Sequence, residues 1–198
     1  MKRLFDFLMS LIAIIILSPV ILIVALAVKF TSPGPILFKQ RRIGKDNVEF
    51  EIYKFRTMRI DTPNVPTHLL ENPEQWITSI GKFLRKISLD ELPQLFNILK
   101  GEMSIVGPRP ALYNQLDLKE MRTKVGVHKL VPGLTGWAQI NGRDEIPLSL
   151  KVNLDKEYLE RNNFFFDIKI IFMTVLSVLK SDGVQEGKAE NNNEKLKV

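Results

Sequence analysis

The sequence FLMSLIAIIILSPVILIVALAV, residues 7–28, contains no charged residue. A helix rises about 1.5 Å per residue, so a stretch of this length covers roughly 30 Å, the thickness of the hydrocarbon core of a bilayer. Three structures fit it: a spanning helix, a cleaved signal peptide, and a helix that enters the membrane and turns back. The basic Lys2-Arg3 start and the small residues of Ala25-Leu26-Ala27 fit a signal peptide. However, the apolar stretch is longer than the usual length of about 7–15 residues.

The residues in and around this stretch favour a helix that turns back. Basic residues stand at both ends, and because such flanks prefer the cytoplasmic side, both ends prefer the same side. Pro19 lies near the middle, has no N–H to donate and clashes with the carbonyl of Ile15, which kinks or breaks a helix. The hydroxyl of Ser18 is placed to satisfy a carbonyl freed in this way. We predict a re-entrant helix-break-helix anchor over residues 1–30, broken at Ser18-Pro19, although a kinked spanning helix fits the same residues.

The composition bounds the remaining possibilities. The chain has 198 residues, enough for one domain with its own core. It has no cysteine, which excludes disulfides, thiol nucleophiles and cysteine metal sites. The formal net charge is +6, and nucleic acid, an anionic membrane surface or a phosphorylated substrate would each explain the basic clusters. A solvated basic face explains any single cluster equally well. The apolar N-terminus favours the membrane and the phosphorylated substrate, with no nucleic acid as partner.

After the apolar stretch, a change of pattern predicts a small β-hairpin. Residues 36–43 and 48–55 have strand-like composition, with apolar and charged residues alternating in the second segment. The sequence Gly44-Lys45-Asp46-Asn47 supplies the turn between them. Residues 60–74, with three prolines, are predicted to be a loop, and residues 76–87 a short helix.

The C-terminal part of the chain predicts one more helix and a tail. Residues 162–180 fit a helix with Asn163 as its cap, and its uncharged portion, residues 170–179, is too short to span a bilayer. It is either a core helix or a helix in the membrane interface. The polar residues 185–198 are predicted to be disordered, so the cytoplasmic body covers residues 31–184. The expected fold class is α+β and mainly helical, with the re-entrant anchor, the small hairpin and amphipathic interfacial helices.

The segment from Ser88 to Gly101 carries the strongest helical signature in the body. Ser88 with Glu91 fits a capping box, and Gly101 is a typical C-terminal stop. Asp90 and Glu91 are expected in the first turn, at the positive end of the helix dipole. Their side chains should point away from an apolar stripe of Leu92, Leu95, Phe96 and Leu99. An acidic pair in this position usually does no more than stabilise the helix, so the neighbouring motifs decide whether it is functional.

Several basic residues are candidates for binding phosphate. In Gly107-Pro108-Arg109-Pro110, each proline fixes a backbone dihedral, so Arg109 loses little freedom when it binds a phosphate. The alternative is a rigid surface turn whose arginine pairs with a local carboxylate. Lys54 and Arg56 add two cations at the end of the second strand, and Arg85 precedes Asp90 closely.

Residues 131–143 contain three glycines and one tryptophan in a loop-like setting. Such a loop approaches a ligand closely through its backbone and stacks a ring on Trp137. A hairpin fits the same residues, so this signal is weak by itself.

Five motifs therefore follow one another along the chain: Ser18-Pro19, Lys54-Phe55-Arg56-Thr57-Met58, Ser88–Leu95, Gly107-Pro108-Arg109-Pro110 and Gly136–Arg143. In this order they resemble the bacterial sugar transferase family, the monotopic phosphoglycosyl transferases. The resemblance covers residues 2–183, nearly the whole chain. The short length resembles the minimal members of the family, the diacetylbacillosamine-1-phosphate transferases of protein N-glycosylation.

The resemblance implies a two-step, ping-pong mechanism. Asp90 attacks the β-phosphate of a UDP-sugar, UMP leaves, and a phosphosugar–aspartyl intermediate forms. Undecaprenyl phosphate then attacks this intermediate to give the diphosphate-linked lipid-sugar, the first membrane step of glycoconjugate assembly. The resemblance also implies Mg²⁺ as cofactor, with Asp90 as its protein contact and Glu91 as base or metal support.

Electrostatics agrees with these roles, because a diphosphate would repel a carboxylate nucleophile unless cations neutralise its charge. The residues expected to bind the substrate phosphates are Arg85, Arg109, Lys54 and Arg56. Those expected to bind the nucleotide are Trp137, Gln139, Asn141 and Arg143.

The resemblance also implies a place in the cell: the bacterial inner membrane, as a monotopic protein whose catalytic domain lies on the cytoplasmic face. The donor sugar, the glycoconjugate pathway and a homodimer stay open. Two rivals are a membrane-tethered binding protein for anionic lipid or nucleic acid, and a nucleotide-sugar hydrolase that needs no lipid.

Overall fold

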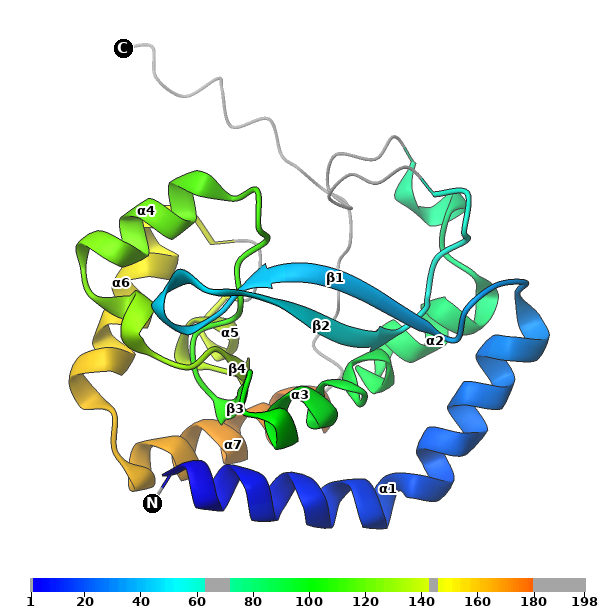
Figure 1. Ribbon diagram of the computed structural model, residues 1–198, viewed down its shortest axis with the longest axis horizontal. Helices are drawn as coiled ribbons and strands as arrows, with labels where there is room; N and C mark the ends of the chain where they lie inside the picture. The colour runs from blue at the N-terminus through cyan, green and yellow to red at the C-terminus, as the bar shows by residue number, and fades with distance from the viewer. Residues whose placement is uncertain (1, 63–71, 143–145, 180–198) are drawn as a thin grey trace.

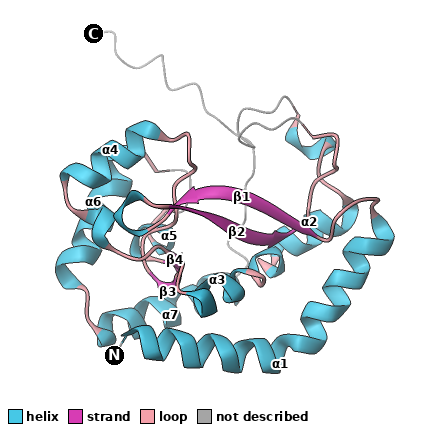
Figure 2. Cartoon of the chain, in the orientation of Figure 1, coloured by secondary structure: helices cyan, strands magenta, loops and turns pink. Residues whose placement is uncertain are grey.

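The computed structural model describes residues 2–62, 72–142 and 146–179, which form a mainly helical α+β structure (Figures 1 and 2). The prediction of a mainly helical α+β fold with a small hairpin is confirmed. In chain order the elements, with η marking 3-10 helices, are α1 (Lys2–Thr31), β1 (Leu37–Ile43), η1 (Lys45–Asn47), β2 (Glu49–Phe55), η3 (Pro73–Gln75), α2 (Ser79–Lys86), η4 (Leu89–Glu91), α3 (Gln94–Lys100), β3 (Ser104–Val106), α4 (Leu116–Lys124), η5 (Val127–Lys129), β4 (Gly133–Thr135), α5 (Trp137–Ile140), α6 (Leu148–Arg161) and α7 (Phe164–Leu179).

Helix α1 is continuous, but it turns sharply between an N-terminal part that runs along the body and a C-terminal part that rises beside it (Figure 1). Pro19 lies inside this helix, and the hydroxyl of Ser18 donates a hydrogen bond to the carbonyl of Ile15 at 2.8 Å. Because Pro19 has no N–H for that carbonyl, the serine replaces the lost bond. The predicted break is therefore corrected to a bend within one helix. Helix α1 is long and apolar enough to cross a membrane.

Replacing Pro19 with alanine is expected to straighten α1, because it restores the missing N–H and removes the clash with the carbonyl of Ile15. The chain has no native cysteine, so paired spin labels at Leu4→Cys and Phe30→Cys report the distance between the two ends of the helix. We expect this distance to shift to longer values in Pro19→Ala. An unchanged distribution would mean that contacts with the body, and not the proline, hold the bend.

Charged residues at the start of α1 fasten it to the body. Lys2 pairs with Asp167 of α7 at 2.5 Å. Asp6 is buried and accepts hydrogen bonds from Ser104 Oγ at 2.8 Å and from a backbone N–H of β3. Arg3 donates to two carbonyls at the end of α3. The N-terminal part of α1 is thus packed against the body.

The predicted hairpin is confirmed, with β1 and β2 antiparallel and Leu37 opposite Phe55. The predicted turn contains the 3-10 helix η1, in which Asp46 has a φ of 54°. Side chains of successive strand residues point to opposite faces. On the face of the hairpin that lies toward the C-terminal part of α1, Phe55 is buried in a cluster with Val24, Val28 and Leu84.

The segment around the acidic pair differs from its prediction. The short helix before it starts at Ser79, because Thr78 caps it by accepting a hydrogen bond from Gly81 N–H. Ser88 has a φ of 57° and makes no side-chain cap, so the predicted capping box does not form. The acidic pair lies in the separate 3-10 turn η4, and α3 begins after Pro93. Gly101 ends α3 with a φ of 90°, as predicted.

The prediction of an apolar stripe along this segment is also only partly confirmed. Leu95 is buried, whereas Phe96 is 42% exposed. The polar side chains of Gln94 and Asn97 are buried instead. Asn97 accepts a hydrogen bond from Tyr53 N–H and donates one to the carbonyl of Glu51, and both of these residues belong to β2. Because η4 interrupts the helix, α3 buries a different face from the one that a single helix over residues 88–101 would bury.

Of the predicted segment 131–143, the described residues 131–142 form neither a plain loop nor a hairpin. Strand β4 pairs in parallel with β3, and α5 follows directly. The partner strand lies about thirty residues earlier in the sequence, so local turn signals did not reveal it.

Helix α7 is confirmed, and Asn163 caps it by accepting from Phe166 N–H. Phe166 and Ile170 are buried in a cluster with Val106 and Tyr158, while Phe165 is 82% exposed. One face of the helix therefore belongs to the core and the other is apolar and exposed. Residues 185–198, predicted to be a tail, lie outside the described residues.

Candidate active site

The acidic pair lies in the turn η4 between α2 and α3, against the end of β2. Asp90 is buried, with 8% of its surface exposed. Leu89 and Leu92, on either side of the pair, pack against the cluster that joins α1 to Phe55. The left-handed backbone of Ser88 ends α2 and starts the turn. The pair is therefore held by apolar contacts on one side of the turn, as expected for a rigid site.

Glu91 contacts two cationic side chains that are far apart in the sequence. Lys54 Nζ lies 2.7 Å and Arg109 Nη2 3.1 Å from the same oxygen, Glu91 Oε1. Burial alone raises the pKa of Glu91, but Lys54 and Arg109 outweigh burial and hold this pKa far below the usual range of a carboxyl group. Glu91 is therefore ionised at any physiological pH.

The pKa of Asp90 is shifted in the opposite direction, although Asp90 is the neighbour of Glu91 in the sequence. Burial raises its pKa to about 6, with Lys54 opposing the shift and the charge of Glu91 adding to it. Arg85 and Arg109 also act on Asp90 through their charges. Two adjacent carboxyl groups with pKa values pushed in opposite directions are typical of a catalytic site, in which each group has its own role.

The backbone of Pro108-Arg109-Pro110 is held at all three of its carbonyls. Gly133 N–H donates to the carbonyl of Pro108 at 2.9 Å, Arg122 to that of Arg109 at 2.8 Å, and Arg42 to that of Pro110 at 3.0 Å. The three donors come from β4, α4 and β1, so three elements set where Arg109 points.

The close approach of β3 and β4 at this point needs glycine. A Cβ on Gly133 would lie 2.1 Å from Gly107 N, and one on Gly107 would lie 2.4 Å from the carbonyl oxygen of Val131. Any side chain here would push apart the strand ends that position the arginine turn.

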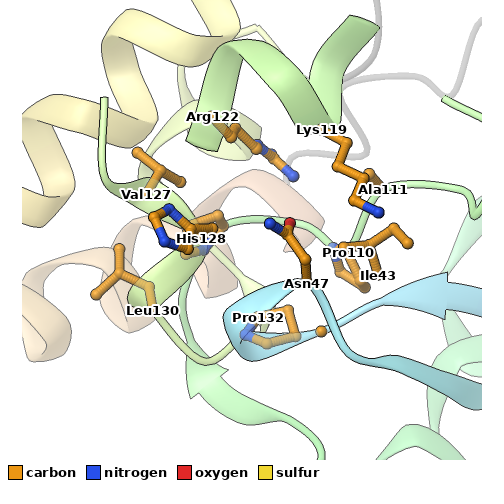
Figure 3. Close-up of a pocket in the computed structure, with 12 residues that line it drawn as sticks. Ile43, Asn47, Pro110, Ala111, Lys119, Arg122, Val127, His128, Leu130 and Pro132 are labelled. Carbon is orange, nitrogen blue, oxygen red and sulfur yellow. The ribbon is translucent and has the colours of Figure 1, made fainter. Parts of the chain in front are cut away.

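Arg122 also makes a buried ion pair with Asp155 of α6, at 2.6 and 2.9 Å to one carboxylate oxygen. Figure 3 shows Arg122 and Pro110 at a small cavity that His128 and Lys119 also line. The roles of Arg122 and Asp155 were not predicted from the sequence. An Arg and an Asp at this separation, on two helices, carry no local signal that they meet.

Two further predicted phosphate ligands have different surroundings. Arg85 donates to Thr57 Oγ1 at 2.8 Å and acts on the charge of Asp90. Arg56, in contrast, is buried and donates to the carbonyls of Ser32 and Pro33, at 2.7 and 2.6 Å. The described contacts of Arg56 fasten the segment that follows α1, so the structure does not bring it to the acidic pair.

The predicted nucleotide ligands lie in α5 and beside it. Trp137 packs on Phe166 at 5.0 Å between ring centres and donates from its indole N–H to Glu157 at 2.8 Å. Gln139 donates to the carbonyl of Leu134, and Asn141 to that of Trp137. The Trp137 contacts pack α5 against α6 and α7, whereas the contacts of Gln139 and Asn141 stay within β4 and α5. Arg143 lies outside the described residues.

The acidic pair fits a divalent cation that is shared with a substrate. Among the described residues there is no cluster of three or more acidic or histidine side chains. Mg²⁺, however, is commonly bound by one or two carboxylates together with substrate phosphates and water. Asp90 offers such a carboxylate, whereas Lys54 and Arg109 already engage one oxygen of Glu91.

The chain is similar to known proteins over most of its length. The family model for bacterial sugar transferases matches residues 1–181. A UDP-glucose:undecaprenyl-phosphate glucose-1-phosphate transferase of Escherichia coli (strain K12) is 42% identical over 183 residues, which cover 88% of this chain and 39% of that protein. The chain thus spans about two fifths of that relative.

Other relatives match over different shares of their length. An uncharacterised sugar transferase, EpsL, of Bacillus subtilis (strain 168) is 43% identical over 189 residues, covering 94% of this chain and 91% of EpsL. A UDP-N-acetylgalactosamine-undecaprenyl-phosphate N-acetylgalactosaminephosphotransferase of Aeromonas hydrophila is 37% identical over 190 residues, covering 93% of this chain and 45% of that protein. From the extent of the family match, this chain belongs to the bacterial sugar transferase family.

Proposed function

We propose that the protein transfers a sugar-1-phosphate from a UDP-sugar to undecaprenyl phosphate, with Asp90 as covalent nucleophile. The observation that carries this proposal is the buried Asp90, with its raised pKa, next to an ionised Glu91 that binds Lys54 and Arg109. The names of the relatives support both substrate classes. These names include different sugars, so the proposal does not extend to one donor sugar or to one pathway.

In the first step, an ionised oxygen of Asp90 attacks the β-phosphorus of the UDP-sugar. The bond from this phosphorus to the oxygen that bridges the two phosphates breaks, and UMP leaves with the bond electrons. In the second step, an oxygen of the lipid phosphate attacks the same phosphorus, and the bond to Asp90 breaks. Asp90 is then free again, and the product is undecaprenyl-diphosphate-sugar. The covalent intermediate lets a soluble donor and a membrane lipid use one site in turn.

Cations at the site offset the charge of the diphosphate. Lys54, Arg85 and Arg109 lie around the acidic pair and would stabilise the charge that develops on the phosphoryl oxygens. Bound Mg²⁺ would neutralise the diphosphate and help UMP to leave, held on the protein by Asp90.

We assign Glu91 to positioning and not to proton transfer. A carboxylate whose pKa is held far below its usual value is a poor proton acceptor. Its contacts at 2.7 and 3.1 Å instead hold Lys54 and Arg109 on the same side of the turn.

The apolar helix α1 supports a place at the membrane, where the lipid acceptor is found. We propose that both ends of α1 lie on the cytoplasmic side of the bacterial inner membrane, as the bend and the basic flanks favour. The site would then lie close to the lipid headgroups.

The test uses the purified chain in lipid nanodiscs with Mg²⁺, undecaprenyl phosphate and a panel of UDP-sugars. We expect UMP release with at least one donor, and labelled phosphosugar on a peptide that contains Asp90 when the lipid is left out. Release of free sugar phosphate instead of lipid product would point to a hydrolase. No UMP release with any donor would favour a membrane-tethered binding protein.

A further inference from the structure

An apolar groove lies next to the acidic turn, on the inner side of the bend of α1. Its volume is about 510 Å³, within the range of sites that hold small ligands. Ile21 and Ala25 of α1 form one wall, and Phe55, Pro93 and Phe96 line the opposite side. Figure 1 shows the C-terminal part of α1, which carries the first wall, rising beside the body.

The groove and the acidic pair share the same turn and the same strand end. Lys54 and Phe55 are neighbours on β2, so their side chains point to opposite faces: Lys54 contacts Glu91, and Phe55 lines the groove. In the next turn, Pro93 lines the groove three residues after Asp90. A hydrocarbon chain in the groove would therefore lie against the segment that carries the nucleophile.

The lining has the chemistry of a site for a phosphorylated lipid. Its side chains are apolar except for Lys29, which is exposed at the end of α1. One cation beside an apolar groove is complementary to a molecule with one phosphate and one hydrocarbon chain. A bilayer phospholipid fits less well, because it brings two chains to a single groove. Phe96, which is 42% exposed, also offers a ring face on which the methyl branches of an isoprenoid chain can pack.

We propose that this groove binds the isoprenoid units next to the phosphate of the polyprenyl phosphate acceptor, with Lys29 facing that phosphate. This inference rests on the proposed function and adds to it a binding site for the second substrate. The groove holds the acceptor chain while the lipid phosphate reaches the phosphosugar on Asp90. Discrimination between polyprenyl phosphate and the surrounding lipids then arises in the groove and not at the acidic pair.

The variant Ala25→Phe fills the groove with a ring, and Leu22→Phe is its matched control. Leu22 is on the same helix but is 60% exposed and does not line the groove. Both variants are assayed in nanodiscs for UMP release without acceptor and for transfer to undecaprenyl phosphate. We expect Ala25→Phe to keep the rate of UMP release and to lose about tenfold or more in kcat/KM for the acceptor, because the ring displaces several methylene contacts. Leu22→Phe should keep both rates.

Three results would overturn the site. One is wild-type acceptor kinetics in Ala25→Phe. Another is an equal loss in both variants, which would indicate a general effect of the added ring in the membrane. A third is an equal loss of UMP release and of transfer in Ala25→Phe. If the wild-type chain releases no UMP from any donor, it is the proposed function that fails, so the two failures are distinguishable.

A labelling experiment on the wild-type chain needs no variant to fold. A polyprenyl phosphate with a diazirine in its first isoprene unit is activated in nanodiscs, and the labelled peptides are identified. We expect label on residues 21–37 or 93–96, reduced by excess undecaprenyl phosphate and not by excess phosphatidylglycerol. Label elsewhere, or equal competition by the phospholipid, would show that the groove holds bulk lipid and would contradict the proposal.

Discussion

Asp90→Asn is expected to abolish sugar-phosphate transfer and, at the same time, to stabilise the metal-free fold at neutral pH. The loss of turnover should be on the order of 10⁴-fold or more, because the proposed nucleophile is removed. The gain in stability follows from the burial of Asp90, which raises the pKa of this residue from 3.8 to about 6. At about 1.4 kcal/mol per pKa unit, the ionised Asp90 costs the folded state up to about 3 kcal/mol.

The sign of the pH dependence follows from this raised pKa. Below about pH 4, Asp90 is protonated in both the folded and the unfolded chain, so its ionisation costs nothing. As the pH rises from about 4 to about 6, the unfolded chain loses the proton first, and the wild-type fold loses stability. The advantage of Asp90→Asn should therefore be absent near pH 4, grow between pH 4 and 6, and be complete above pH 6.

Thermal unfolding in the presence of a chelator, at several pH values, measures this difference. Asp117→Asn is a suitable control, because Asp117 is an exposed acidic residue in the first turn of α4. Its substitution should not reproduce the pH-dependent gain. If Asp90→Asn is no more stable than the wild type at pH 7, burial does not penalise the charge of Asp90. If it still transfers sugar phosphate at the wild-type rate, the nucleophile is another residue.

The second large effect is expected at the buried pair of Arg122 and Asp155. Arg122→Met leaves the Asp155 carboxylate buried without its cation and the carbonyl of Arg109 without its donor. Removing one partner of such a pair typically costs about 3–5 kcal/mol. Burial already raises the pKa of Asp155 against the opposing charge of Arg122, so the destabilisation should increase as the pH rises. Chemical denaturation at two pH values measures it.

A double variant separates stability from positioning. Arg122→Met with Asp155→Leu removes both buried charges, so much of the lost stability should return. Transfer activity should stay at least about tenfold below the wild type, because the turn that aims Arg109 has lost one of its three donors. Full recovery of activity would show that Arg122 does not position Arg109. As a control, Lys124→Met breaks the exposed pair with Glu120 on the same helix and should cost less than about 1 kcal/mol.

The local sequence was sufficient to predict an element wherever the interactions that form this element are local. The hairpin followed from alternation and a turn, α7 from its Asn163 cap, and the end of α3 from Gly101. Prediction was less accurate at Ser88, where a left-handed residue splits one expected helix into a 3-10 turn and an α-helix. A capping pattern cannot reveal this, because the packing of Leu89 and Leu92 against α1 also acts on the turn.

The sequence by itself determined the apolar N-terminal helix with its proline, the acidic pair and the cations available to it, since each of these depends on residue type and spacing along the chain. Only the tertiary structure decided which cations meet the pair: Lys54 and Arg109 contact Glu91, whereas Arg56 contacts the carbonyls of Ser32 and Pro33. It also decided that one carboxyl group is ionised at any physiological pH while its neighbour titrates near pH 6. The reason is physical: desolvation and ion pairing depend on distances across the fold, and such distances bring together residues far apart in the sequence.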